Sequence, residues 1–187
     1  MNQILKQSEI DKTKIIASSN NVFSIELVEK ISYKSAMDII DISKDLEKIY
    51  GPNALLNEDN ITKYFNTNTL PFIAKYNNKI IGFIIGAPIE YFKNQSWVQY
   101  DENIHKNNTL YTYAFIFKKD FRKKAGFSKT LKKIYTSWAK KRGFQYISGH
   151  VSKTVINNFP KENTEIIKEF ENWYDSNTPF IYYRRKI

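Results

Sequence analysis

A short basic turn with one glycine is the part of this chain whose residues could bind phosphate. It reads Lys123-Lys124-Ala125-Gly126-Phe127-Ser128 and stands between an apolar run, 110–117, and a long amphipathic segment, 127–142. Backbone N–H groups in the first turn of a helix have no partner within that helix, and the helix dipole adds partial positive charge there. A strand, a basic turn and a helix N-terminus in this order therefore predict a site for an anionic ligand.

The segment after the turn has the spacing of a helix with one apolar face. Large apolar residues recur at i, i+4, i+7, i+8 and i+11, which places them on one side of a helix: Phe127, Leu131, Ile134, Tyr135 and Trp138. Gly143, directly after Arg142, is a natural end for this helix. The lysines of the segment, Lys132 among them, belong to its solvated side in this interpretation.

Two common phosphate-binding signatures are absent, since the chain has neither G-x-x-x-x-G-K-[ST] nor G-x-G-x-x-G. Lys123 to Ser128 instead resembles the [QR]-x-x-G-x-[GA] signature with which GCN5-related N-acetyltransferases, the GNAT family, bind the pyrophosphate of acyl-CoA. Lys123 stands where Gln or Arg is usual, and Ser128 where Gly or Ala is usual. In a second alignment Arg122 is the motif's arginine and the turn is one residue longer. The alternative is an ordinary strand–helix connection with solvated lysines.

The segments around the turn are similar to the same family. Two apolar runs, 71–76 and 79–86, flank Asn77-Asn78, which predicts a β-hairpin because Asn tolerates positive φ. In the family such a hairpin forms the second and third strands, and Gly82 stands where the third strand usually has a glycine. The run 110–117 is then the fourth strand and 144–151 the fifth, with the helix as the crossover between parallel or splayed neighbours.

The resemblance extends from about Asn21 to the C-terminus. It implies a mixed α/β (α+β) fold, with a mostly antiparallel sheet flanked by helices and with splayed fourth and fifth strands. We expect residues 21–187 to form a single acyl-CoA-binding domain, preceded by an arm or appended helix over residues 1–20. The remaining elements expected from the pattern are a first strand over 21–30, helices over 32–50, 57–65 (with Asn57 as N-cap) and 161–174, and a final strand over 179–184.

The resemblance also implies a reaction. Members of the family bind acetyl-CoA and let an amine attack the thioester carbonyl directly, with pantetheine lying between the splayed strands and a backbone N–H of the fourth strand, here among 114–117, facing the oxyanion. Carried onto this sequence, the acetyl-CoA site comprises Phe115, Ile116, Phe117, Arg122, Lys123, Lys124, Ala125, Gly126, Phe127, Ser128, Lys129 and Asn157.

Acid–base residues are harder to assign. Many members carry a tyrosine general acid in a late N-x-x-A-x-x-x-Y pattern, but the matching segment 163–170 ends in Phe170, which cannot donate a proton. Either Tyr174 takes this role, or the register differs and Asn157 or its neighbour Asn158 is the family asparagine. Glu90, after the third strand, and Tyr113, on the fourth, are candidate general bases.

The segment 94–108 is the least regular interior part of the chain. It contains aromatic and acidic residues, including Asp101 and Glu102, and could bind an amine or could be a connector covering the sheet edge. His105 is expected to be exposed and His150, at the end of the fifth strand, to be a hydrogen-bonded structural residue. Two histidines so distant in sequence offer no metal-ligand spacing, so we expect no metal.

Composition limits the classes of protein. The chain has 187 residues, no cysteine and a net charge of +10. It therefore has no disulfides and no cysteine nucleophile. It contains no apolar run near the roughly 20 residues of a membrane span and no apolar signal segment in residues 1–20. We expect a cytoplasmic protein, monomeric or homodimeric, without a membrane partner.

Two other functions stay open beside acetyl transfer to a small-molecule or protein amine. A CoA-binding regulatory domain without turnover would fit the missing tyrosine. A nucleic-acid-binding module would fit the basic residues between Lys118 and Arg142, but aromatic residues are not interleaved with them, so nucleic acid is the less favoured partner. A polyamine acceptor would need a local acidic pocket made by Asp101, Glu102 or Glu90.

Overall fold

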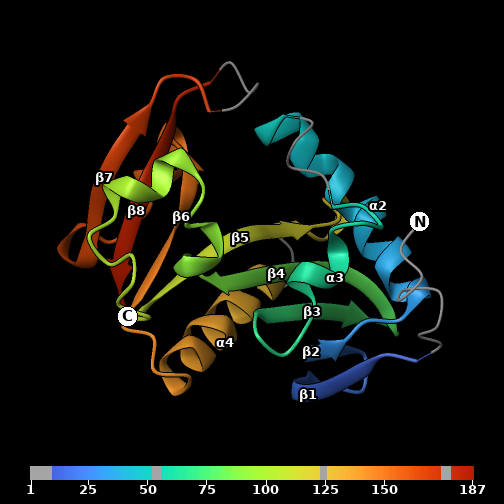
Figure 1. Cartoon of the computed structure of the whole chain (residues 1–187). Helices are drawn as coiled ribbons and strands as arrows, with labels where there is room; N and C mark the ends of the chain where they lie inside the picture. Colours follow the sequence, from blue (N-terminus) through green and yellow to red (C-terminus); the bar gives the residue numbers. More distant parts are fainter. Residues whose placement is uncertain (1–9, 52–55, 123–125, 174–177) are drawn as a thin grey trace.

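The computed structural model describes residues 10–51, 56–122, 126–173 and 178–187. They form an eight-stranded sheet in the order β1-β2-β3-β4-β5-β6-β8-β7. Every neighbouring pair is antiparallel except β5 and β6. Helix α2 lies over one face of the β1–β5 part and α4 over the other, while β6, β7 and β8 form a second wing (Figure 1). The mixed, mostly antiparallel fold expected from the sequence is confirmed.

The sheet begins earlier than the sequence suggested. Strand β1 (Lys12–Ser19) pairs with β2 (Phe23–Lys30) through a turn in which Asn20 and Asn21 have positive φ. The expectation of an arm or helix over 1–20 is therefore wrong for residues 12–19. The physical reason is that β1 is an edge strand with mostly exposed side chains, so its sequence lacks the apolar run of a buried strand.

Two helices follow β2. Helix α2 (Tyr33–Tyr50) starts where Ser32 accepts a hydrogen bond from the Ser35 N–H, and it ends at Gly51. Helix α3 is shorter than expected, Ile61–Tyr64, because Asn57 caps the preceding turn instead: its side chain accepts from the N–H groups of Asp59 and Asn60. The helix predicted over 32–50 is confirmed. Of the helix predicted over 57–65, only the last turn is helical.

The predicted hairpin is confirmed. Strands β3 (Leu70–Tyr76) and β4 (Lys79–Pro88) are joined by Asn77 and Asn78, with φ of 47° and 59°. Gly82 allows close approach of β5, since a Cβ there would lie 2.7 Å from the Ile116 carbonyl oxygen.

An irregular connection leads to the fourth predicted strand. It contains the 3-10 turns η2 (Ile89–Phe92) and η3 (Ser96–Tyr100) before β5 (Thr109–Phe117). A further 3-10 turn, η4 (Lys119–Phe121), lies between β5 and helix α4 (Phe127–Lys141), and β6 (Tyr146–Ser152) follows α4. Leu131, Tyr135 and Ala139 of α4 are buried against the sheet, as the apolar spacing predicts.

Strands β5 and β6 are parallel neighbours that separate after three residue pairs, Thr109–Tyr111 with Tyr146–Ser148. Beyond this point β5 continues with β4 and β6 with β8, so the sheet opens into two wings (Figure 1). This is the splay that the resemblance implied.

The C-terminal part corrects one prediction. After α5 (Lys153–Ile156) and η5 (Lys161–Asn163), residues Thr164–Phe170 form β7, which pairs with β8 (Phe180–Lys186). The helix expected over 161–174 is therefore wrong for residues 164–170. Thr164, Ile166 and Ile167 are β-branched and favour a strand, and pairing with β8 outweighs the helical spacing of the apolar residues.

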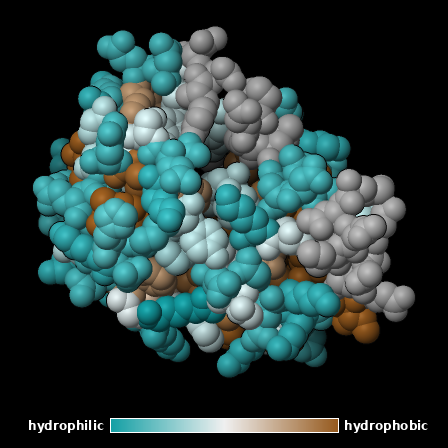
Figure 2. All heavy atoms as spheres, viewed as in Figure 1, coloured by the Kyte–Doolittle hydropathy of each residue, from teal (hydrophilic) through white to brown (hydrophobic). Residues whose placement is uncertain are grey.

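The two faces of the sheet carry separate hydrophobic clusters. One lies under α2 and includes Ile39, Phe83 and Tyr182; the other lies under α4 and includes Phe72, Leu131 and Tyr135. The surface in Figure 2 is mostly hydrophilic, with smaller apolar patches among the polar residues. Helices therefore cover both faces of the sheet while the gap between β5 and β6 stays open to side chains from each side.

Candidate active site

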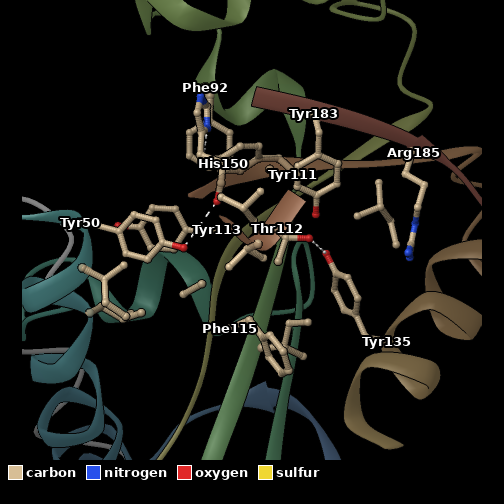
Figure 3. Close-up of a pocket in the computed structure, with 18 of the residues that line it drawn as sticks. Tyr50, Phe92, Tyr111, Thr112, Tyr113, Phe115, Tyr135, His150, Tyr183 and Arg185 are labelled. Carbon is tan, nitrogen blue, oxygen red and sulfur yellow. Dashed lines mark hydrogen bonds between the residues drawn. The ribbon is translucent and has the colours of Figure 1, made fainter. Parts of the chain in front are cut away.

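A cavity lies where β5 and β6 separate. Its volume is about 620 Å³, and side chains from α2, α3, η2, β5, α4, β6 and β8 line it. Figure 3 shows Thr112, Tyr113 and Phe115 of β5 on one side and His150 and Tyr183 of the second wing on the other. The splay thus creates a cleft whose two ends meet different elements.

A β-bulge shapes the β5 wall. Ile85 pairs with Ala114 and Gly86 with Thr112, so Tyr113 is an extra residue on β5. Its ring lines the cavity and stacks on Tyr64 at 4.0 Å between centroids. Bulges turn backbone and side-chain groups away from the regular ladder, and this one does so at the cavity.

Three hydroxyl-bearing residues, Thr112, Tyr135 and Tyr183, line the cavity. The Tyr135 and Thr112 hydroxyls are 3.1 Å apart, and Tyr183 lines the same region (Figure 3). Burial raises the pKa of Tyr183 to about 12 and raises that of Tyr135 as well. Both phenols are therefore protonated at neutral pH and can act as donors.

Two cations lie on the α4 side of the cavity. Lys132 and Arg185 both line it, and the Lys132 ammonium lies 4.6 Å from the centroid of the Phe159 ring. Burial, with a smaller contribution from Arg185, lowers the pKa of Lys132 to about 8. An anion bound beside these groups would relieve that cost. The assignment of Lys132 to a solvated side is therefore corrected: the side chain is partly buried at the cleft.

The opposite end of the cavity is aromatic. Rings from α2, α3, η2, η3 and β5 line it: Tyr50, Tyr64, Phe92, Trp97 and Tyr111. Neither Asp nor Glu is present among the described residues that line the cavity. The cleft is thus cationic at one end and aromatic at the other.

His150 belongs to the aromatic end. Its Nδ1 lies 2.9 Å from the Tyr111 hydroxyl, and its ring stacks on Trp173 at 3.5 Å. Its Nε2 is buried without a hydrogen-bond partner in the described parts of the chain. Burial holds its pKa well below the usual 6.5, so the imidazole is neutral at pH 7. The prediction of a hydrogen-bonded structural histidine is confirmed for the hydrogen bond, and the ring also lines the cavity.

The predicted acetyl-CoA residues on β5 divide between cavity and core. Phe115 lines the cavity, whereas Ile116 and Phe117 are buried in the clusters under α2 and α4. Arg122 is tied down at both ends of its guanidinium: Nε donates to the Phe117 carbonyl at 2.7 Å, and Nη2 pairs with Asp45 at 2.6 Å. Of this group only Phe115 therefore faces the cleft through its side chain.

The basic turn is described from Gly126 onward, and Lys123, Lys124 and Ala125 lie outside the described residues. Gly126 has φ of 68°, and a Cβ there would meet nothing within 4 Å. Phe127 packs on Phe23, with ring centroids 4.6 Å apart. Ser128 is partly exposed. Lys129 lies on an outer basic face with Lys133 and Lys140. The glycine and Ser128 thus stand at the N-terminus of α4, and Phe127 anchors it.

The remaining predicted residues do not gather at the cleft. Glu90 does not line the cavity; its Oε1 accepts from the Asn107 N–H at 2.9 Å, within the connection before β5. Asn157 is exposed after α5 and does not line it either. Tyr174 lies outside the described residues. Tyr113 is thus the one acid–base candidate that the described structure places in the cavity.

Sequence reasoning missed Lys132, Tyr135, Tyr183 and Arg185 as lining residues. Tyr135 was assigned to the apolar face of its helix, and that face turns toward the cleft. The alternation of β8 could have indicated Tyr183 and Arg185 on one face of a strand.

Solved structures with the same architecture include acetyltransferases. The ribosomal-protein-S18-alanine N-acetyltransferase from Escherichia coli is similar over 88% of this chain and 94% of its own, with a TM-score of 0.63 and 13% identity. Arabidopsis thaliana Naa50, in complex with a bisubstrate analogue, is similar over 89% of this chain and 99% of its own, with a TM-score of 0.61 and 15% identity. A GNAT family acetyltransferase from Elizabethkingia anophelis with acetyl-CoA bound is similar over 90% of this chain and 100% of its own, with a TM-score of 0.54 and 16% identity. At these identities the likeness shows the fold. A comparison with curated proteins gives no significant match.

A mixed sheet opened between two parallel strands, with a helix after a glycine turn, defines an acetyltransferase-type fold. The sequence model of the acetyltransferase (GNAT) family matches residues 39–160, well over half of the chain. The chain therefore belongs to the GNAT acetyltransferase family.

Two further observations concern other classes of protein. None of the described helices is both long and apolar enough to cross a membrane. No group of three or more His, Cys, Asp or Glu side chains in the described ranges is arranged to hold a metal ion.

Proposed function

We propose that this chain is an N-acetyltransferase that transfers the acetyl group of acetyl-CoA to an amine by direct attack in a ternary complex. The observation that carries the proposal is the cavity at the splay of β5 and β6, with Lys132 of α4 and Arg185 of β8 at one end and aromatic side chains at the other. Holding two reactants in one cleft can supply much of the acceleration of such a reaction.

The residues at the α4 end fit the acyl-CoA role. The open space at the Gly126 Cβ position and the first turn of α4 suit a diphosphate, and Lys132, further along α4, and Arg185 supply positive charge in the cavity. Phe115 and Thr136 line the same cavity. When bound, acetyl-CoA would supply an activated acetyl group, and backbone N–H groups of β5 next to the bulge would face the developing oxyanion.

Proton movements fall to the hydroxyl groups of the cleft. The attacking amine must lose a proton, and a water held beside Tyr113, or Tyr113 itself as the phenolate, is the proposed acceptor. The departing thiolate must gain one. Tyr174 was predicted for this step. Among the described tyrosines, Tyr183 offers a second donor, because its pKa near 12 keeps the phenol protonated.

Titration calorimetry with CoA and acetyl-CoA in 150 mM salt tests the proposal, with ADP and duplex DNA as controls. We expect micromolar binding of both thiol and thioester, about −8 kcal/mol. In a separate reaction with acetyl-CoA, mass spectrometry should show an accepted amine heavier by one acetyl group. Binding of DNA without binding of CoA would contradict the proposal.

Two other functions are kept as alternatives. A regulatory CoA-binding domain would bind acetyl-CoA and acetylate no amine. The outer basic face of Lys129, Lys133 and Lys140 favours nucleic acid; that binding would weaken steeply between 50 and 200 mM salt.

A further inference from the structure

The aromatic end of the cleft is built from rings that cover one another's faces. Tyr64 stacks on Tyr113 at 4.0 Å and an interplanar angle of 15°, Trp97 on Tyr111 at 4.7 Å and 29°, and His150 on Trp173 at 3.5 Å and 22°. A cage for a cation needs open ring faces around it. Here the stacked rings already cover one face of each partner, and the aliphatic side chains of Leu46, Ile49 and Val155 line the cavity beside them. Such an apolar wall suits a flat apolar group.

Among the described residues, this end of the cavity has no carboxylate to pair with a cation. Asp101 is buried away from the cavity, where it accepts from the Tyr182 hydroxyl at 2.5 Å and pairs with Arg184 at 2.7 Å. Glu90 is bound to the Asn107 N–H and does not line the cavity. The acidic pocket that a polyamine would need is therefore not formed by these two residues.

The charge that does line this end is positive. Lys63, on α3, is exposed at the cavity and lies beside Tyr64, with its ammonium 5.6 Å from the ring centroid. A second ammonium on the acceptor would lose water on entering and would meet this lysine. Burying a charge without a partner is costly.

We propose that the acceptor is a small primary amine that carries an aromatic group and no second cationic group. This inference rests on the proposed function, since it concerns the amine that the acetyl group would reach. The cavity of about 620 Å³ is within the range of small-molecule sites, and the pantetheine arm would share it, so the space left at the aromatic end suits one ring and an amine-bearing chain.

Two matched pairs of amines test the two parts of the proposal. The first pair, 4-methylbenzylamine and 4-(aminomethyl)benzylamine, differs by one ammonium; the second, benzylamine and cyclohexylmethylamine, differs by the flatness of the ring. With acetyl-CoA saturating, we expect kcat/KM to be at least tenfold higher for 4-methylbenzylamine than for its diamine, and severalfold higher for benzylamine than for its saturated analogue. Preference for the diamine, for spermidine, or for a peptide with an N-terminal Phe over benzylamine would overturn the inference.

Variants assign these preferences to the cleft. Lys63→Glu should reduce the discrimination against 4-(aminomethyl)benzylamine severalfold, while Lys79→Glu, the same charge change on an exposed residue outside the cavity, should leave it unchanged. Phe92→Leu should lower kcat/KM for benzylamine more than for cyclohexylmethylamine. Equal effects of Lys63→Glu and Lys79→Glu would contradict the assignment.

Calorimetry separates failure of this inference from failure of the proposed function. Acetyl-CoA binding with transfer to spermidine but not to benzylamines contradicts the inference alone. Binding of 4-methylbenzylamine, but not its diamine, by a protein that does not bind acetyl-CoA contradicts the proposed function and supports the acceptor chemistry of the cavity.

Discussion

The two ends of the cleft differ in how the sequence builds them. The α4 end rests on one helix, which carries Lys132, Tyr135 and Thr136, with Arg185 added from β8. The aromatic end is assembled from α2, α3, two 3-10 turns, β5 and β6. A ligand site encoded locally can be found as a motif, whereas one assembled from distant elements becomes visible only in the fold.

They also differ in what keeps them in place. The α4 end depends on packing of a long amphipathic helix against the sheet. The aromatic end is tied to the second wing by Asp101, which ends the η3 turn and binds Tyr182 and Arg184 of β8. Variants can therefore be chosen that affect one end and leave the other intact.

Asp101→Asn should have the largest effect. It removes the carboxylate from a buried ion pair, and we expect a loss of about 3 kcal/mol in the free energy of unfolding, measured by urea denaturation at pH 7. KM for the acceptor amine should rise while the affinity for CoA is retained. The neighbouring exposed Glu102 gives the control: Glu102→Gln should change stability by no more than about 0.5 kcal/mol. If Asp101→Asn lowered the free energy of unfolding no more than Glu102→Gln does, the ion pair would not hold the aromatic end in place.

Gly126→Glu acts on the other end. It places an anion at the N-terminus of α4, and we expect CoA affinity measured by calorimetry to fall at least about 100-fold, or about 2.7 kcal/mol, with the circular dichroism spectrum unchanged. Gly126→Ala introduces the same left-handed strain at φ of 68° without the charge and should keep most of the affinity. Retained CoA affinity in Gly126→Glu would remove the turn from the site.

Lys132 should make CoA binding dependent on pH. Its pKa is about 8 in the free protein, and bound phosphate would favour the ammonium and raise that pKa. Binding is then linked to proton uptake above pH 8, so the affinity for CoA should fall between pH 7 and pH 9. We expect Lys132→Met to weaken binding about tenfold at pH 7, or about 1.4 kcal/mol, and to remove this pH dependence.

Lys79→Met is the matched control for Lys132→Met and should keep the wild-type pH profile of CoA binding. A wild-type profile in Lys132→Met would place Lys132 away from the phosphates.

His150 should give the smallest effect, as a slope of stability against pH. Its pKa in the folded protein is held well below 6.5 by burial, whereas the unfolded chain takes up a proton near pH 6.5. The stabilisation that neutral His150 gives to the folded state is therefore complete above pH 6.5. It is lost as the pH falls, by at most about 1.4 kcal/mol in the free energy of unfolding per pH unit. Urea denaturation between pH 5 and 7 should show a shallower slope for His150→Gln than for the exposed control His105→Gln. Equal slopes would contradict a neutral buried His150.

The elements that could be predicted from the sequence are those whose structure depends on neighbouring residues in the chain. The Asn77-Asn78 hairpin and the helix after Gly126 follow from turn chemistry and apolar spacing, and the structure has both. Strand β1 was missed because an edge strand with polar side chains has little apolar pattern. Residues 164–170 have helical spacing, but they pair with β8, a partner that local spacing cannot reveal.

The site followed the same rule. Phe115, which lines the cavity, was predicted from its strand, and the role of Gly126 in binding stays a prediction. Lys132 was placed with the solvated lysines, because helical spacing alone does not show that the helix passes along a cleft. Arg122 was assigned to a ligand from its position in sequence, yet Asp45, far away in the chain, holds its guanidinium.

The splay has a consequence for cohesion as well as for binding. Strand β5 is joined to β6 by three residue pairs, while seven join β4 to β5 and seven join β6 to β8. The two wings are thus linked by a short ladder, by the contacts of Asp101 with Tyr182 and Arg184, and by the side chains or ligand that fill the space between them. A molecule bound across that space becomes a structural bridge, so the melting temperature of the whole fold is coupled to the concentration of its own ligand.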